Sequence, residues 1–216
     1  MGNPRPRPQL LAQKHLIIRE HLNLSQTAIR DTLDVSAAGR ISDYENGKRR
    51  PSLIVTLHYS RLAQAPMASL VDDEVSLEAF RKQLGTFRYG ELERCVIKLE
   101  VMGLQHRMGS KSQHRPKHLG RKLLQIRKAL RLSQSDMLRH LGVEGSFQTA
   151  RISEYESGAR EPSLWILLAY GRVAQVHLES LIDDEATLPD QLPGNFSFDR
   201  YKEEACFYQQ EAEPNR

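Results

Sequence analysis

Apolar residues recur three and four positions apart along much of the chain, which is the spacing of amphipathic helices. In the N-terminal third this pattern predicts helices over residues 9–22, 26–33, about 37–46 and 53–64, followed by a short helical turn at 66–70. Long runs of alternating apolar and polar residues, which are typical of strands, do not occur. The sequence therefore predicts an all-α protein.

Several residues at the ends of these segments support the predicted boundaries. Ser25 is expected to cap the second helix, because its hydroxyl can accept a hydrogen bond from a free N–H of the first turn. Gly47 and Gly142 are placed where helices end, and both are expected to be left-handed. Ile41 and Tyr44, three positions apart on the third helix, are expected to face the core.

Part of this pattern occurs twice. Residues 40–47 are Arg-Ile-Ser-Asp-Tyr-Glu-Asn-Gly, and residues 151–158 are Arg-Ile-Ser-Glu-Tyr-Glu-Ser-Gly. In both places Pro-Ser-Leu follows after three further residues, and Leu-x-Leu-Ser-Gln precedes, at 22–26 and 130–134. Such repetition indicates a duplicated structural unit of about 70 residues. The chain is therefore expected to hold two small helical domains.

Both repeats resemble the helix-turn-helix domains of the XRE family, to which the lambda and Cro phage repressors belong. In the first repeat the resemblance rests on Leu24-Ser25-Gln26, Val35, Ile41, Tyr44-Glu45-Asn46-Gly47 and Pro51-Ser52-Leu53. It covers roughly residues 9–77 and 117–188, and it implies two tandem lambda-repressor-like five-helix domains. The chain departs from the family between the turn Val and the core Ile, with about one added residue in the first repeat and about four in the second.

The segments outside the repeats are expected to form a linker and a tail. Residues 78–116 are interpreted as a partly helical linker, with a helix near 91–101 and then a basic tether. That helix is expected to dock on the first domain, and a homodimer seam is the alternative. Residues 189–216 form an acidic tail with aromatic side chains, which is typical of a protein-binding segment, a core cap or a disordered end.

Charge and cysteine content narrow the class of protein. The net charge of +4 and the isoelectric point near 9.1 are mildly basic, and the surplus of Lys and Arg lies in the N-terminal arm and in 106–122. The acidic runs 72–74 and 183–185 are interpreted as solvated domain ends. No stretch has the roughly 20 apolar residues of a membrane helix, and a secretion signal is not expected. With two cysteines, both outside the repeats, a cytoplasmic location at the bacterial nucleoid is expected.

Chemistry other than binding has little support in the sequence. Gly-rich phosphate loops and the Gly-x-Ser-x-Gly and His-Glu-x-x-His motifs do not occur, so the protein is not expected to be an enzyme. His106, His114 and His118 lack the clustered Cys or carboxylate ligands of a metal site. No metal and no cofactor is therefore expected.

The candidate DNA contacts lie on the third helices and the segments beside them. Phosphate contacts are expected from the start of each second helix and from the loop after each third helix, and base contacts from the third helices themselves. The candidates are Gln26, Ser36, Arg40, Ser42, Lys48, Arg49, Arg50, Gln134, Ser146, Gln148, Thr149, Arg151, Ser153 and Arg160. For the two glutamines, a simple preference for helix starts is the alternative.

The two repeats differ in these positions. Three residues added within 143–151 give the second repeat more side chains that can hydrogen-bond to bases, whereas Lys48-Arg49-Arg50 gives the first repeat more charge for phosphates. By resemblance, Arg19 with Glu45, and Arg127 with Glu156, are internal ion pairs rather than DNA contacts.

These observations predict sequence-specific binding of double-stranded DNA by a transcriptional regulator with two reading heads in one chain. Because the heads differ, the DNA site is expected to have unlike halves. The alternative is a protein–protein interaction module on the same fold, an antitoxin or a coactivator-like bridge, which the near-neutral charge inside each repeat favours.

Overall fold

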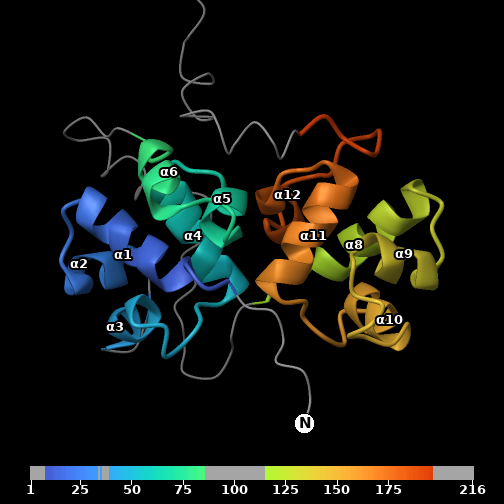
Figure 1. Ribbon diagram of the computed structural model, residues 1–216, viewed down its shortest axis with the longest axis horizontal. Coiled ribbons are helices and arrows are strands. Elements are labelled where there is room, and N and C mark those ends of the chain that lie inside the picture. Colours follow the sequence, from blue (N-terminus) through green and yellow to red (C-terminus); the bar gives the residue numbers. More distant parts are fainter. Residues whose placement is uncertain (1–7, 34, 36–38, 86–114, 197–216) are drawn as a thin grey trace, which may run out of the picture.

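The computed structural model describes residues 8–33, 35, 39–85 and 115–196. Within these ranges the chain forms eleven helices and no strand, so the all-α prediction is confirmed there (Figure 1). None of these described helices is long and apolar enough to cross a membrane. Ser36, the predicted linker helix near 91–101 and the tail beyond residue 196 lie outside the described residues.

The helices of the first half correspond to those of the second, with one addition. The first half contains α1 (Leu11–His21), α2 (Gln26–Thr32), α3 (Arg40–Glu45), α4 (Leu53–Ala63), α5 (Met67–Val71) and α6 (Leu77–Lys82). The second half contains α8 (Leu119–Ala129), α9 (Gln134–His140), α10 (Ala150–Glu156), α11 (Leu164–Ala174) and α12 (Leu178–Ile182). Most boundaries lie within two residues of the predicted ones.

Two helices differ from the prediction. α3 begins at Arg40 rather than near residue 37, because Gly39 before it is left-handed, with φ of 81°, and cannot continue a right-handed helix. α6 was not predicted. Ser76 caps it by accepting a hydrogen bond from the Ala79 N–H at 3.1 Å, and Phe80 anchors it in the core.

The predicted helix ends are confirmed where the structure describes them. The Ser25 hydroxyl accepts a hydrogen bond from the Ala28 N–H at 3.0 Å. Ser133 caps α9 in the same way and completes a capping box with Asp136. Gly47 and Gly142 have φ of 68° and 67°, which is the left-handed conformation expected of them.

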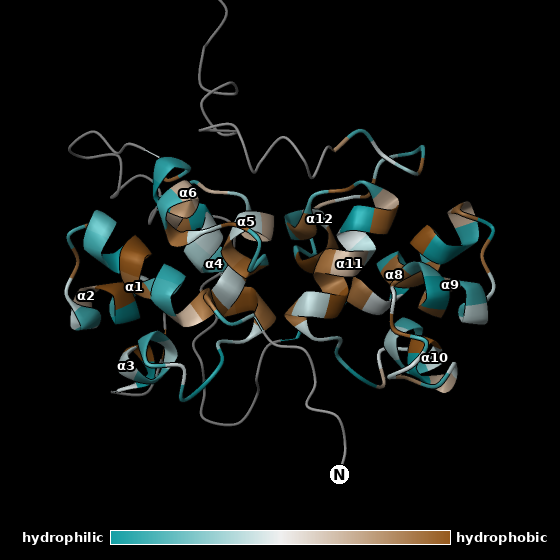
Figure 2. Cartoon of the chain, in the orientation of Figure 1, coloured by the Kyte–Doolittle hydropathy of each residue, from teal (hydrophilic) through white to brown (hydrophobic). Residues whose placement is uncertain are grey.

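The core forms from the residues that were predicted to face inward. Ile41 and Tyr44 of α3 are 2% and 5% exposed, and Ile152 and Tyr155 of α10 are buried likewise. α4 and α11 carry apolar residues around most of their circumference, and Figure 2 shows both in the middle of the molecule. A helix that is apolar on most sides is stable in water only when it is covered on most sides, which these two helices are.

One buried lysine in each half joins the first helix to the end of the fifth. The Lys14 ammonium donates to the backbone carbonyls of Ser69 and Asp72 at 2.7 and 2.6 Å. Burial lowers the pKa of Lys14 to about 8. Lys122 makes the same two bonds in the second half. Lys122 is therefore a buried structural residue rather than part of an exposed basic tether.

The acidic runs hold helices together, so their interpretation as solvated domain ends is wrong. The Asp73 carboxylate accepts hydrogen bonds from the backbone N–H groups of Gln9 and Leu10, just before α1. Asp184 accepts from the corresponding N–H groups before α8. Asp72 is 3% exposed. The sequence pattern missed these roles because the bonded residues lie more than 60 positions away.

The two halves meet through α4 and α5 on one side and α11 and α12 on the other (Figure 1). Arg61 forms an ion pair with Asp183, and Arg172 forms one with Asp72 at 2.6 Å. The offsets 172 − 61 and 183 − 72 are both 111, so the two pairs join equivalent positions in opposite directions. The contact therefore has the reciprocal form of a two-fold dimer interface, within one chain.

Glu179 adds a contact that breaks this symmetry. Its carboxylate accepts from the backbone N–H of Met67 at 2.6 Å and from the Ser60 hydroxyl at 3.3 Å. Ala68 occupies the equivalent position in the first half and cannot make these bonds.

Candidate nucleic-acid interface

α3 and α10, the two helices predicted to face DNA, lie on the same side of the molecule. In Figure 1 both are at the lower edge, beneath the outer ends of the two halves. Each buries one Ile and one Tyr, together with the side chain of a Glu near its end, Glu45 or Glu156. Each also packs against the first helix of its own half.

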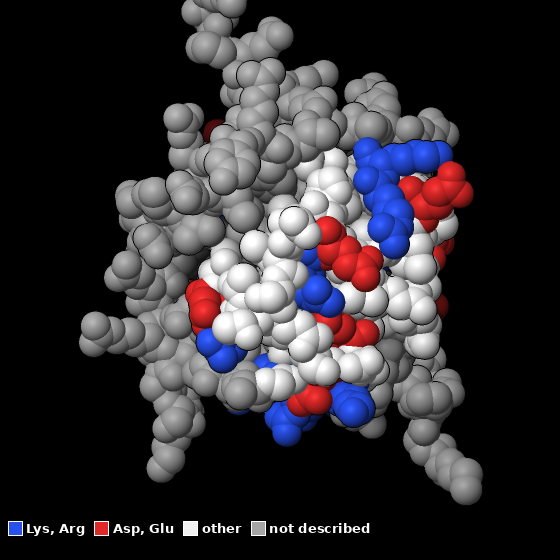
Figure 3. Space-filling view, turned by 90° about the vertical axis from the view of Figure 1, so that its left-hand side faces the viewer, with Lys and Arg blue, Asp and Glu red and all other residues white. Residues whose placement is uncertain are grey.

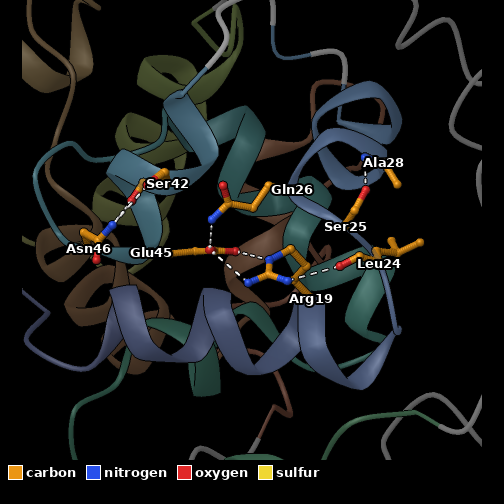
Figure 4. A network of polar contacts seen from close by, with 8 residues as sticks. All are labelled: Arg19, Leu24, Ser25, Gln26, Ala28, Ser42, Glu45 and Asn46. Atoms are coloured by element: carbon orange, nitrogen blue, oxygen red, sulfur yellow. Dashed lines mark hydrogen bonds and ion pairs between the residues drawn. The ribbon is translucent and has the colours of Figure 1, made fainter.

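A bidentate ion pair fixes α3 on α1. Arg19 Nε and Nη2 donate to the two carboxylate oxygens of Glu45 at 2.5 and 3.2 Å, and Nη1 donates to the Leu24 carbonyl oxygen at 3.1 Å (Figure 4). The hydrogen bond to Glu45 raises the pKa of Arg19 above its ordinary value. Arg127 and Glu156 form the same pair between α8 and α10, at 2.5 and 2.8 Å. The expectation of internal ion pairs is confirmed.

The glutamine at the start of each second helix contacts the same carboxylate. The Gln26 side-chain amide donates to Glu45 at 2.8 Å, and Figure 4 shows it pointing at that carboxylate. The Gln134 amide donates to Glu156 at 3.4 Å. In the free chain both glutamines therefore connect the second helix to the third, and Gln26 remains exposed at the surface.

The predicted contacts of the first half gather around α3 and the loop after it. Lys48, Arg49 and Arg50 are exposed. Arg49 forms a 3.3 Å ion pair with Asp43 at the surface. Figure 3 shows Lys and Arg side chains at the lower edge of this end of the molecule, with acidic residues between them.

Two further candidates of the first half lie on α3 itself. Ser42 is half-buried, and its hydroxyl accepts a hydrogen bond from the Asn46 amide at 3.1 Å (Figure 4). Arg40, at the start of the helix, is also half-buried.

The segment before α10 and the outer side of α10 carry four exposed candidates of the second half. Phe147 packs against the core, and the side chains around it remain exposed. Those exposed candidates are Ser146, Gln148, Thr149 and Ser153. Their amide and hydroxyl groups are the kind that can exchange hydrogen bonds with base edges.

Two candidate arginines of the second half share one carboxylate. Glu154 accepts from Arg151 at 2.7 Å and from Arg160 at 2.8 Å. The Arg151 guanidinium also lies 5.9 Å from the centre of the Phe147 ring. In the first half the shorter Asp43 takes the place of Glu154 and pairs with Arg49. Each arginine uses one nitrogen on Glu154, so its other N–H groups can still donate to a phosphate or a base.

Sequence reasoning did not single out a basic cleft beside α10. Residues before and at the start of α8 face the C-terminal end of α10 and the loop that follows it, around a cleft of about 310 Å³. Lys117 and Arg121 line this cleft. The signal in the sequence was the acid-free stretch 106–122, but nothing local in it separates these side chains from the buried Lys122.

Within the described residues, no group of His, Cys, Asp and Glu side chains is arranged to hold a metal ion. No protein-family model matches the chain, and comparison with curated proteins and with solved structures finds no match either.

Proposed function

We propose that the chain binds double-stranded DNA in a sequence-specific manner, as a transcriptional regulator with two helix-turn-helix reading heads of the XRE type. The observation that carries this proposal is the common orientation of α3 and α10, which lie on one side of the molecule (Figure 1). Two recognition helices that face the same way can enter two successive segments of the major groove on one face of a DNA duplex.

The local geometry of each half supports the proposal. A short capped helix, a turn and a second helix with an apolar inner side make up the helix-turn-helix arrangement. α2 with α3, and α9 with α10, have this form. The bidentate pairs Arg19–Glu45 and Arg127–Glu156 hold the second helix of each unit from behind, which leaves its outer side available.

The two heads are proposed to have different roles in DNA binding. The first contributes affinity for the DNA backbone through Lys48, Arg49 and Arg50, which are exposed in the loop after α3. The second contributes sequence readout through Gln148 and its neighbours, because a glutamine amide can pair with both hydrogen-bonding groups of adenine in the major groove.

The contact between the halves gives the proposal a geometric consequence. Most repressors of this kind bring two heads together by dimerisation, whereas here the reciprocal ion pairs Arg61–Asp183 and Arg172–Asp72 join two unlike heads of one chain. The separation of the heads is then set by this interface. The DNA site should have two unlike halves at a single fixed spacing.

Selection of bound sequences from a random duplex pool, using the full chain, tests the proposal. The expected result is enrichment of one site with two unlike half-sites whose spacing does not vary. Mobility-shift assays on that site should show affinity that falls steeply with salt. Recovery of no enriched sequence, together with no salt-dependent shift on any duplex, would contradict DNA binding.

A protein-binding role is the second candidate, and one observation favours it. Arg151 and Arg160 are both paired with Glu154, and the exposed candidates just before α10, Ser146, Gln148 and Thr149, are neutral polar groups. A surface of that kind suits a protein partner as well as a base-pair edge. Failure of the selection experiment would favour this candidate.

A further inference from the structure

The cleft beside α10 is built from three separate segments of the chain. Its walls are the residues just before α8, the first turn of α8, and the end of α10 with the loop that leads to α11. The helices approach closely here: a Cβ at Gly120 would lie 2.7 Å from the carbonyl oxygen of Glu156. The floor of the cleft is therefore backbone, and its chemistry comes from the side chains at its rim.

Those side chains are mainly cationic. Arg115, Lys117, Arg121 and Arg160 all line the cleft, and all four are exposed. Arg160 is paired with Glu154 at 2.8 Å. Within the described part of the chain, none of the ion pairs involves Arg115, Lys117 or Arg121. The cleft thus gathers cations that have no ion-pair partner among the described residues.

Two carboxylates also line the cleft, and they offset its positive charge only in part. Glu156 is held by two nitrogens of Arg127. Glu161 is half-buried; burial raises its pKa, and the charge of Arg115 acts in the opposite direction. Asp184 accepts hydrogen bonds from the backbone N–H groups of Lys117 and His118, just before α8. The positive charge that an anion in the cleft would meet comes from the side chains at its rim.

The two halves carry Lys and Arg side chains at different positions near the third helix. At the positions of Lys117 and Arg121 the first half has Gln9 and Gln13, by the offset of 108 that relates the first helices (117 − 9 = 121 − 13 = 108). At the positions of Lys48 and Arg50 the second half has Ala159 and Glu161, by the offset of 111 (159 − 48 = 161 − 50 = 111).

The second half has thus lost two cations from the loop after its third helix. It has two more across the cleft, Lys117 just before α8 and Arg121 in its first turn.

We propose that this cleft is a phosphate-binding site, and that it holds a backbone phosphate of the DNA that α10 reads. The inference rests on the proposed DNA binding for the source of the phosphate. The cleft borders the end of α10, so a phosphate seated in it lies next to the helix that faces the bases. Arg115, Lys117 and Arg121 supply the charge, and the second head then has a backbone anchor of its own.

The test compares two double variants of the full chain. Lys117→Gln with Arg121→Gln restores the residue type of the first half at both positions. The matched control is Lys128→Gln with Arg131→Gln, which removes the same charge from exposed positions of the second half that do not line the cleft. Binding to a selected duplex is measured across salt concentrations. In a second arm, inorganic phosphate is titrated into each protein and backbone amide resonances are followed by NMR.

If the cleft holds one DNA phosphate, the cleft variant lowers the slope of log affinity against log salt by about 0.9, the change expected for the loss of one phosphate contact. The control variant changes the slope by less than about half of that. Equal slopes for the two variants on DNA that the wild-type chain binds would overturn the cleft proposal and leave DNA binding intact.

The phosphate arm separates this result from a failure of DNA binding itself. If the wild-type chain binds no DNA, but phosphate shifts the resonances around Gly120 and Gly158 and the cleft variant abolishes those shifts, the site stands and its ligand is a free phosphorylated molecule. If the wild-type chain responds to neither duplex nor phosphate, both proposals are overturned.

Discussion

Arg61 on α4 and Asp183 just beyond α12 form an ion pair across the boundary between the two halves, 122 residues apart in sequence. The side chains are 21% and 16% exposed, so water screens the pair only in part. Arg172 and Asp72 repeat it in the opposite direction. The two unlike halves thus share an interface of the kind that identical subunits form in a symmetric dimer. This interface sets the position of α3 relative to α10.

We expect the Arg61–Asp183 pair to contribute measurable coupling energy. A double-mutant cycle with Arg61→Ala and Asp183→Ala should give about 1 kcal/mol, because both groups are mostly shielded from solvent. The measurement is urea unfolding of the four proteins. The same cycle on Lys82 and Glu78, an exposed pair with side chains 71% and 81% accessible, serves as the control and should give coupling near zero. Coupling no larger at the interface than in the control contradicts a role for this pair in joining the halves.

Two acidic residues of α3 should differ in their importance for stability. Glu45 is 5% exposed and holds both the Arg19 guanidinium and the Gln26 amide, so Glu45→Ala leaves Arg19 without its partner and should cost about 3 kcal/mol. Asp43 pairs with Arg49 at the surface, at 3.3 Å, and Asp43→Ala should cost less than about 1 kcal/mol. Chemical denaturation of both variants provides the comparison. Similar losses for the two would mean that the bidentate pair does not fix α3 on α1.

His15 should make the protein sensitive to acid. It is fully buried against Tyr59, with ring centres 4.2 Å apart, and within the described residues neither ring nitrogen has a hydrogen-bond partner. Burial lowers its pKa from 6.5 to about 3. Between those two values the unfolded chain binds a proton that the folded chain does not. The free energy of unfolding should therefore fall as the pH drops through this window, by up to about 1.4 kcal/mol per pH unit from this group.

The control for His15 is present in the chain, because Leu123 occupies the equivalent place in the second half (123 − 15 = 108). His15→Leu should remove this part of the acid sensitivity. It should also stabilise the protein at pH 7 by about 1 kcal/mol or more, because a buried polar ring without partners is replaced by an apolar side chain. Unfolding curves at pH 7 and pH 5 measure both effects. An unchanged difference between the two pH values would show that His15 does not titrate as its burial requires.

If the first head binds the DNA backbone and the second reads the sequence, as proposed, substitutions of Gln148 and of Lys48 should change DNA binding in different ways. Gln148→Ala should cost about 1–3 kcal/mol on the selected site, with specificity relaxed at one position and little change on scrambled DNA. Lys48→Ala should weaken binding to selected and scrambled duplexes alike and lower the salt slope by about 1. Both are measured by titration of the full chain on matched and scrambled sites. Equal weakening of both sites by Gln148→Ala would show that the division of labour is wrong.

The features that local sequence determines were predictable. Helix boundaries follow from apolar spacing and from caps such as Ser25 and Gly47, whose partners lie within four residues. The duplication was visible as a repeated string. The pairs Arg19–Glu45 and Arg127–Glu156 were expected because the resemblance to the XRE family implies them, and in the structure each holds a third helix on its first helix. The proposed DNA contacts remain predictions.

Other features depended on residues that are distant in sequence. α6 is a six-residue helix, too short for apolar periodicity to mark it, and burial of Phe80 under α1 stabilises it. In the sequence, Asp72 and Lys122 resemble ordinary surface charges. The fold buries both side chains and brings a hydrogen-bond or ion-pair partner to each.

The helices and the duplication can be recognised in the amino-acid sequence, because helix formation and capping depend on neighbours a few residues apart. How the copies face each other, and which cations meet at one cleft, follow from the packed fold, because Arg61 and Asp183, or Lys117 and Arg160, become neighbours only after the core has packed. The spacing of apolar and polar residues in the sequence does not indicate such contacts, since each depends on the positions of whole helices in space.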